Sequence, residues 1–161
     1  MKKDSDKTNV MRLLDQKKVG YEAFYYDGEG LSGEDVARVL GEDERNVFKT
    51  LVARGRDKAF YVFVIPVAEE LDLKKAALAV GEKSIEMIKQ KELLPLTGYV
   101  HGGCSPIGMK KFFPTVLDES ASCLEKICIS AGRVGAQVCL SPQDLEKMIK
   151  LKYAPLTKQA V

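Results

Sequence analysis

This sequence of 161 residues has one histidine, His101, and its four cysteines form no Cys-x-x-Cys pair. A tetrahedral zinc site is built from such ligands at characteristic spacings, so we expect no metal. A serine–histidine–carboxylate triad would have to use His101, whose neighbours lack the nucleophile-elbow pattern. The phosphate-binding pattern Gly-x-x-x-x-Gly-Lys-Ser/Thr is missing as well. The sequence therefore gives no support for a zinc enzyme or a P-loop enzyme, and little for a triad hydrolase.

Targeting and membrane signals are also missing. The N-terminal segment is polar, without the apolar core of a secretory signal, and no apolar run approaches the length of a membrane span. The net charge of +2 is too small to indicate nucleic-acid binding by itself, and the lysine pairs are interpreted as solvated surface. We expect a cytoplasmic protein that does not bind membranes, with its cysteines as reduced, mostly buried thiols. These cysteines are Cys104, Cys123, Cys128 and Cys139.

Capping residues and hydrophobic periodicity divide the chain into short helices and strands. Helices are predicted over residues 8–18, 33–40 and 73–80 and after the Ser141-Pro142 start signal, with Leu151 extending the apolar face of the last helix. Strands are predicted over residues 21–26, 47–54, 59–67, 115–117, 127–130 and 137–140, whereas 84–88 fits either a strand or a helix. We predict one α+β domain over residues 1–161, with a mixed, partly barrel-like β-sheet and helices packed outside.

Lys49 stands in the middle of an apolar, strand-like run from Val47 to Val52. Strand alternation places it on one face with Val47 and Leu51, and the opposite face is apolar too. A lysine there is costly to bury unless an anionic or polar group meets it, and its head cannot easily reach water beside the strand. We therefore favour a functional lysine over one that merely extends into solvent.

A glycine-rich loop from His101 to Gly108 joins two apolar segments. Glycine tolerates positive φ and has no Cβ, so such a loop can bring backbone N–H groups close to a ligand. The amides near Gly102, Gly103 and Cys104 could hold a developing oxyanion, a role in which one donor is typically worth ~10²–10³ in rate. Cys104 is also a candidate nucleophile, because turn amides lower a thiol pKa, but a small apolar filler is the favoured interpretation.

Five segments, taken in order, resemble the YbaK family, which is related to the editing domain of prolyl-tRNA synthetase. The specific motifs are Phe-Lys-Thr-Leu-Val at residues 48–52 and Gly-Gly-x-Ser-Pro-x-Gly at residues 102–108. Weaker support comes from residues 66–75, 130–135 and 141–145. The resemblance extends from about Val10 to Ala154 and so covers nearly the whole chain.

The resemblance implies an enzyme of translation fidelity. Its activity would be that of a trans-acting aminoacyl-tRNA deacylase (a lyase or hydrolase) that removes cysteine from mischarged Cys-tRNA(Pro), with Cys-tRNA(Cys) as a further candidate substrate. In this family the lysine and the first loop glycine that match Lys49 and Gly102 are central, so both are expected to be catalytic. The expected substrate-binding residues are Tyr26, Phe48, Thr50, Gly103, Ser105, Pro106 and Gly132. The resemblance further implies no cofactor, a mixed α/β domain around a curved sheet, and prolyl-tRNA synthetase as a partner.

The mechanism that the resemblance implies is assisted by the substrate: the cysteine thiol attacks its own ester carbonyl and leaves as a thiolactone. An attached and well-oriented thiol can reach an effective concentration of ~10⁵ M or more, so the protein need only position the ester and stabilise charge. Proline has no thiol, and cognate Pro-tRNA would therefore survive without a steric sieve.

Two positions depart from the family pattern. Gln137 stands where an acidic residue is frequent, and Arg133-Val134 where a basic pair is common. The loss of one basic residue would weaken phosphate contacts only modestly. Two alternatives stay open: a sister editing domain that hydrolyses Ala- or Ser-tRNA by water attack in a size-limited pocket, and a non-catalytic tRNA-binding module.

Overall fold

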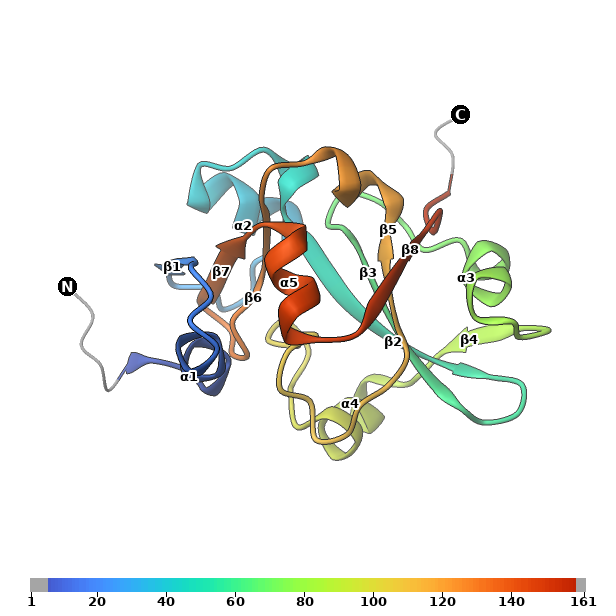
Figure 1. Cartoon of the computed structure of the whole chain (residues 1–161). Helices are drawn as coiled ribbons and strands as arrows, with labels where there is room; N and C mark the ends of the chain where they lie inside the picture. Colours follow the sequence, from blue (N-terminus) through green and yellow to red (C-terminus); the bar gives the residue numbers. More distant parts are fainter. Residues whose placement is uncertain (1–5, 159–161) are drawn as a thin grey trace.

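The computed structural model describes residues 6–158, in which helices pack around two β-sheets (Figure 1). In this range the α-helices are α1 (Asn9–Gln16), α2 (Gly33–Leu40), α3 (Leu73–Val80), α4 (Gln90–Thr97) and α5 (Pro142–Met148), and the 3₁₀ turns include η2 (Glu44–Asn46) and η3 (Glu119–Cys123). The strands are β1 (Glu22–Tyr25), β2 (Phe48–Gly55), β3 (Phe60–Pro66), β4 (Ile85–Met87), β5 (Thr115–Asp118), β6 (Ile127–Ser130), β7 (Ala136–Leu140) and β8 (Leu151–Ala154). The predicted α+β class is confirmed.

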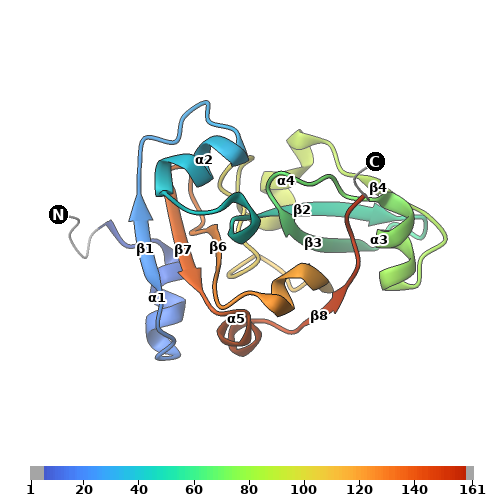
Figure 2. The same ribbon diagram turned by 90° about the horizontal axis from the view of Figure 1, so that it is seen from above.

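The strands are divided between two sheets, neither of which closes within the described residues. One is antiparallel with the order β1-β7-β6, and the other is mixed with the order β4-β2-β3-β5-β8, where β5 runs parallel to β3 and β8. A parallel bridge between Val47 and Cys128 joins the start of β2 to β6. The barrel-like arrangement therefore takes the form of two open sheets that meet at this bridge, with β1, β7 and β6 at one end of the molecule and β2 and β3 at the other (Figure 2).

Most of the core lies between the two sheets. Val64 of β3 and Ile129 of β6 both belong to this buried layer, which α1 and α5 extend with the fully buried Leu14 and Leu145. Phe63 of β3 points to the other face of the mixed sheet, into a second cluster that includes residues of α3. Both faces of β3 are thus covered, which suits a strand that is apolar along nearly its whole length.

Helix boundaries follow the capping signals closely. The Ser32 hydroxyl accepts a hydrogen bond from the Asp35 N–H, and the Asp35 carboxylate accepts one from the Ser32 N–H, so a complete capping box begins α2. Asp72 caps α3 and Ser141 caps α5 by accepting hydrogen bonds from first-turn amides. Gly41 ends α2 with a φ of 71°, which glycine adopts at little cost. The predicted helices 33–40 and 73–80 are confirmed.

Two elements are missing from the sequence prediction. Helix α4 contains Pro95, which normally marks a helix end, and its start is held by the Glu92 carboxylate, which accepts from the Lys89 N–H at 2.7 Å. Strand β8 contains Leu151, which pairs with Thr115 of β5. Its assignment to the last helix is wrong, because α5 ends before it and the chain extends along the edge of the sheet. The ambiguous segment 84–88 forms strand β4.

The predicted set of four reduced thiols is wrong. Cys128 of β6 and Cys139 of β7 stand directly opposite each other in the antiparallel pair and form a disulfide, with their Cα atoms 4.0 Å apart. Cys104 is buried and free, and Cys123 is exposed and free. Strand register decides which residues face each other, so the spacing of the cysteines along the chain did not reveal this pairing.

Candidate active site

A cavity of about 470 Å³ lies where the two sheets meet. Its walls come from the start of β2, the residues after β1, the start of α2 and the glycine-rich loop. Strand β4 pairs with Ala53–Gly55 of β2, so the earlier half of β2 lies beyond the end of β4 at the edge of the sheet. This free edge and the glycine-rich loop both contribute to the lining of one cavity.

Lys49 lines the cavity from β2 and is half-buried. Among the described residues its ammonium group has no ion pair or hydrogen bond, and no Asp or Glu side chain lines the cavity. An ammonium group without a counterion in a partly desolvated site attracts anionic or strongly polar ligand atoms. Lys49 is therefore placed to bind a carbonyl oxygen or a phosphate.

The glycine-rich loop contributes Gly102 and Cys104 to the cavity lining. Gly102 has a φ of +87°, a conformation that favours glycine. In the described part of the chain the N–H groups of Gly102 and Cys104 donate no hydrogen bond, whereas the N–H of Gly103 donates to the Val100 carbonyl at 3.0 Å. The amide of Gly103, expected as an oxyanion donor, is thus already engaged, and those of Gly102 and Cys104 are free.

A tyrosine and a glutamine form a polar pair on another wall. Gln137 is 6% exposed, and its Nε2 donates a hydrogen bond to the Tyr26 hydroxyl at 3.3 Å. Burial raises the pKa of Tyr26, so the phenol keeps a proton that it can donate to a ligand. The Gln137 Oε1 and the Thr50 Oγ1 are buried without a hydrogen-bond partner in the described residues. Two residues of the cavity wall therefore carry buried polar atoms that have no protein partner in the described range.

Cys104 and His101 also line the cavity, but neither shows the contacts of a catalytic nucleophile or base. Burial raises the pKa of the Cys104 thiol to about 12, so the thiol stays protonated at neutral pH and is a poor nucleophile. His101 is exposed, and within residues 6–158 it makes no hydrogen bond or ion pair with a carboxylate, which is the contact that a triad needs. The geometry favours the interpretation of Cys104 as an apolar filler.

The nine predicted site residues fall into two groups. Five line the cavity: Tyr26, Phe48, Lys49, Thr50 and Gly102. Four do not: Gly103, Ser105, Pro106 and Gly132. Ser105 is fully buried and its Oγ accepts from the Ile107 N–H at 3.2 Å, and an added Cβ at Gly103 would come within 2.9 Å of the Arg133 backbone. Ser105 and Gly103 thus have roles in the packing of the loop, and none of the four residues belongs to the cavity lining.

Sequence reasoning did not identify several residues of the lining. They are Leu31, Ser32, Val36, Leu93, Ser130 and Val134, among others. Ser130 and Val134 lie in segment 130–135, where the resemblance could have pointed to them. Leu93 belongs to α4, which was not predicted, so no signal placed it near the site.

Long apolar helices and metal-ligand clusters are not found in the described range. Its five α-helices are seven or eight residues long. None of the helices in residues 6–158 has the length and apolarity needed to cross a membrane. In the same residues no three or more His, Cys, Asp and Glu side chains are grouped so that they could hold a metal ion.

Relatives of known sequence match most of the chain. The aminoacyl-tRNA editing domain model matches residues 29–148. A protein of Enterococcus faecalis, which bears the name putative Cys-tRNA(Pro)/Cys-tRNA(Cys) deacylase EbsC, is 46% identical over 158 residues, covering 97% of this chain and 96% of that protein. The proline–tRNA ligase of Shouchella clausii is 28% identical over 107 residues, which are 66% of this chain and 19% of the ligase.

Solved structures share the fold. A structure described as a putative trans-editing enzyme for prolyl tRNA synthetase has a TM-score of 0.82 and 23% identity, covering 94% of this chain and 99% of that one. A hypothetical protein of known structure has a TM-score of 0.86 and 21% identity, covering 94% and 100%. At such identities the likeness shows the fold alone. The matches to the family model and to EbsC, taken with this fold and cavity, show that the chain belongs to the aminoacyl-tRNA editing domain family.

Proposed function

We propose that this chain is a trans-acting aminoacyl-tRNA deacylase that removes cysteine from Cys-tRNA(Pro). The observation that supports this most directly is one cavity lined by an unpaired ammonium group, Lys49, and by free backbone amides at Gly102 and Cys104. The name of EbsC, which aligns over nearly the whole chain, points to the same reaction and adds Cys-tRNA(Cys) as a second substrate.

The reaction needs little from the protein because an aminoacyl ester is already activated. The cysteine Sγ forms a bond to its own ester carbonyl carbon, the bond from that carbon to the ribose oxygen breaks, and the thiol proton passes to the ribose oxygen. The products are tRNA with a free terminal hydroxyl and a thiolactone, which water opens to cysteine. Lys49 and the Gly102 amide would stabilise the oxyanion that develops on the carbonyl oxygen.

The cavity volume supports discrimination by chemistry rather than by size. One methylene group changes discrimination between two substrates by only about 10–200-fold. A pocket that admits alanine and rejects proline by size must therefore have a volume close to that of alanine. This cavity, at about 470 Å³, is within the range of sites that hold whole small molecules. Water attack on Ala- or Ser-tRNA is therefore the weaker candidate.

We further propose prolyl-tRNA synthetase as a partner and the whole chain as one editing domain. A net charge of +2 suggests weak affinity for tRNA by itself, so a partner that delivers the substrate would raise its local concentration. Helix α1 lies outside the family match, yet its Val10 and Leu14 are buried in the core between the sheets. This packing supports a single domain that includes α1.

The experiment compares three substrates on the same tRNA. Purified protein is incubated with Cys-tRNA(Pro), Ser-tRNA(Pro) and S-methylcysteinyl-tRNA(Pro), and release of the amino acid is followed by mass spectrometry. Serine replaces the sulfur by oxygen, and S-methylation blocks the thiol while keeping its sulfur. We expect rapid release of cysteine, with transient thiolactone, and release of the other two at the rate of the buffer control.

Equal release from all three substrates would show that water, not the thiol, attacks the ester. Faster release of serine from Ser-tRNA(Pro) than of cysteine would assign the chain to the sister activity. Binding of tRNA that is the same with and without the acyl group, with no turnover, would leave a tRNA-binding module.

A further inference from the structure

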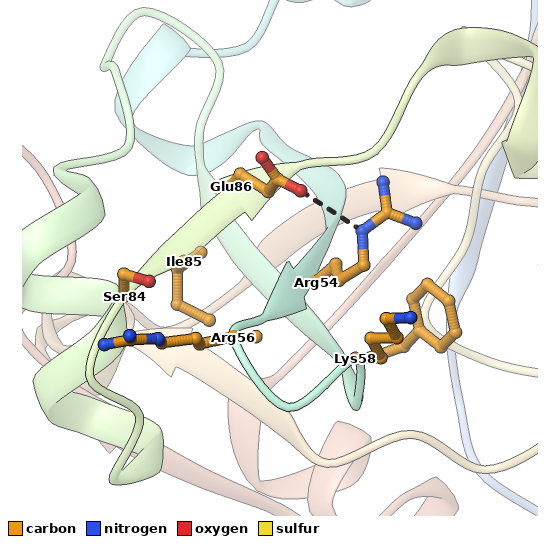
Figure 3. A pocket seen from close by; sticks show the side chains of 8 residues that line it. Arg54, Arg56, Lys58, Ser84, Ile85 and Glu86 are labelled. Carbon is orange, nitrogen blue, oxygen red and sulfur yellow. Dashed lines mark hydrogen bonds and ion pairs between the residues drawn. The ribbon is translucent and has the colours of Figure 1, made fainter.

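A second cavity, of about 850 Å³, lies at the far end of β2, where the β2–β3 hairpin meets β4. Its lining contains three basic side chains, Arg54, Arg56 and Lys58, and one acidic side chain, Glu86. Figure 3 shows Arg56 extending toward Ser84 and the Arg54 guanidinium group beside Glu86. This pocket takes no part in the deacylation chemistry, because it lies well away from Lys49 along the same strand.

The three cations of this hairpin pocket differ in how they are held. Arg54 forms ion pairs with Glu86 at 3.3 Å and with Glu92 of α4 at 3.0 Å, so its position is fixed. Arg56 and Lys58 are exposed, and among the described residues their side chains have no ion pair or hydrogen bond. Two free cations beside a fixed one are suited to successive phosphates of an extended polyanion.

Aromatic rings accompany these cations. The Arg54 guanidinium carbon lies 5.9 Å from the centroid of the Phe60 ring, and Phe60 meets Phe113 edge to face at 6.0 Å between centroids. Phe112, which directly precedes Phe113 in the chain, is 62% exposed. Any of the nucleobases can stack on an exposed aromatic ring. Sites that bind single-stranded nucleic acid therefore typically combine cationic side chains with aromatic ones.

The charge of the chain is concentrated around this pocket. Segments 54–60, 82–92 and 108–113 carry eight Lys and Arg and four Asp and Glu, a net charge of +4, whereas the whole chain carries +2. Contacts tie these segments together: Arg54 pairs with Glu86 and Glu92, and Phe60 packs on Phe113. The remainder of the chain is therefore acidic overall, and a polyanion would be directed to this end of the molecule.

The hairpin pocket and the active-site cavity are connected by shared elements. Strand β2 contributes Lys49 to one and Arg54 to the other, a separation of about 17 Å at the rise of a β-strand. Helix α4 borders both, because its Leu93 lines the active-site cavity and its Glu92 holds Arg54. Several nucleotides of a single strand span such a distance.

We propose that the hairpin pocket binds the sugar–phosphate backbone of the RNA strand whose aminoacylated 3′ end enters the active-site cavity. Arg56 and Lys58 contact phosphates, and Phe60, which lines the pocket, offers a surface for stacking. This proposal rests on the proposed function, since it names the part of the protein that holds the body of the same substrate.

The test separates RNA binding from chemistry by using two substrates. Wild-type protein and the double variant Arg56→Ala/Lys58→Ala are assayed on Cys-tRNA(Pro) and on 3′-O-cysteinyl-adenosine, which has no phosphate. For the variant we expect the KM for Cys-tRNA(Pro) to rise about tenfold with kcat unchanged, and the slope of log KM against log salt to fall by about 1.4, for two lost phosphate contacts. Both parameters for cysteinyl-adenosine should stay at the wild-type values.

The matched control is Lys150→Ala/Lys152→Ala, which removes two exposed lysines at the opposite edge of the same sheet and should leave the salt slope unchanged. If wild-type protein releases cysteine from tRNA and the hairpin variant keeps the wild-type KM and salt slope, the proposal is wrong while the proposed function stands. If the hairpin variant also loses activity on cysteinyl-adenosine, the pocket supports the catalytic fold and the proposal is again wrong. Wild-type protein that cleaves neither substrate would overturn the proposed function itself.

Discussion

Gln137 of β7 donates a hydrogen bond at 3.3 Å to the hydroxyl of Tyr26, the residue that follows β1. The bond fixes the orientation of a buried amide whose other end, Oε1, has no partner in the described residues. Both residues line the cavity, where the Tyr26 hydroxyl accepts from the amide and keeps its own proton to donate, whereas the amide oxygen is buried. Gln137 is thus a neutral amide at the position where the resemblance to the YbaK family predicted an acidic residue.

We expect Tyr26→Phe to lower the free energy of unfolding, although the substitution removes only one oxygen atom. The substitution leaves both polar ends of the buried Gln137 amide unpaired, which costs about 1–3 kcal/mol of the free energy of unfolding. Gln137→Leu in the same background should recover most of this loss, because it removes the unpaired amide. Urea denaturation of the two single variants and the double variant measures the coupling. Additive effects would show that the bond contributes nothing.

Lys49→Met should reduce kcat/KM for Cys-tRNA(Pro) at least tenfold. The substitution removes the ammonium group but keeps most of the apolar stem. Because Lys49 forms no ion pair among residues 6–158, the melting temperature should stay the same or rise. Lys150→Met, on the exposed surface, is the control and should be fully active. Retained activity in the Lys49 variant would remove this side chain from the mechanism.

Gly102→Ala should lower the deacylation rate by about 10²-fold, since it disturbs the backbone that carries one free donor. The position has a φ of +87°, and a Cβ would lie 3.5 Å from the Val134 side chain in the cavity wall. Gly81→Ala is a matched control, because its φ of +74° imposes similar strain while no atom lies within 4 Å of the added Cβ. Both variants should lose about 1 kcal/mol of stability, and the control should keep its rate. Equal rate losses would assign the effect to strain.

The Cys104 thiol should make stability fall at high pH. Burial raises the pKa of this thiol from 9.0 to about 12, so the native state holds the proton more tightly than the unfolded chain. The stabilisation is complete below pH 9 and is lost as pH rises toward 12, which amounts to about 2 kcal/mol near pH 10.5. Urea denaturation at pH 8 and about 10.5 should show a larger loss for the wild-type protein than for Cys104→Ala. Parallel losses would contradict the buried, protonated thiol.

Reduction of the Cys128–Cys139 disulfide should lower the free energy of unfolding. The bond closes a loop of 11 residues, for which the chain-entropy model gives about 3 kcal/mol. Guanidinium denaturation with and without reductant measures the difference. The double variant Cys128→Ala/Cys139→Ala should be insensitive to reductant, which excludes effects at Cys104 or Cys123. Four titratable thiols in the unreduced, unfolded protein would show that the bond does not form.

Local signals in the sequence determined those elements whose ends are set by neighbouring residues. Helix α2 begins at its Ser32–Asp35 capping box and ends at Gly41, so short-range hydrogen bonds fix both limits. Helix α4 could not be found in this way. Its Pro95 opposes a helix locally, and a tertiary ion pair between Glu92 and Arg54 of β2 contributes to its position.

The sequence by itself determined the α+β class, the strand that carries Lys49 and the loop that carries Gly102, because alternation, caps and glycines act over a few residues. Only the tertiary structure decided that these two segments line one cavity, that the Gly103 N–H donates to the Val100 carbonyl, and that Cys128 forms a disulfide with Cys139. Those facts depend on how the two sheets meet and on strand register. Contacts between residues far apart in the chain fix both, and no local pattern encodes them.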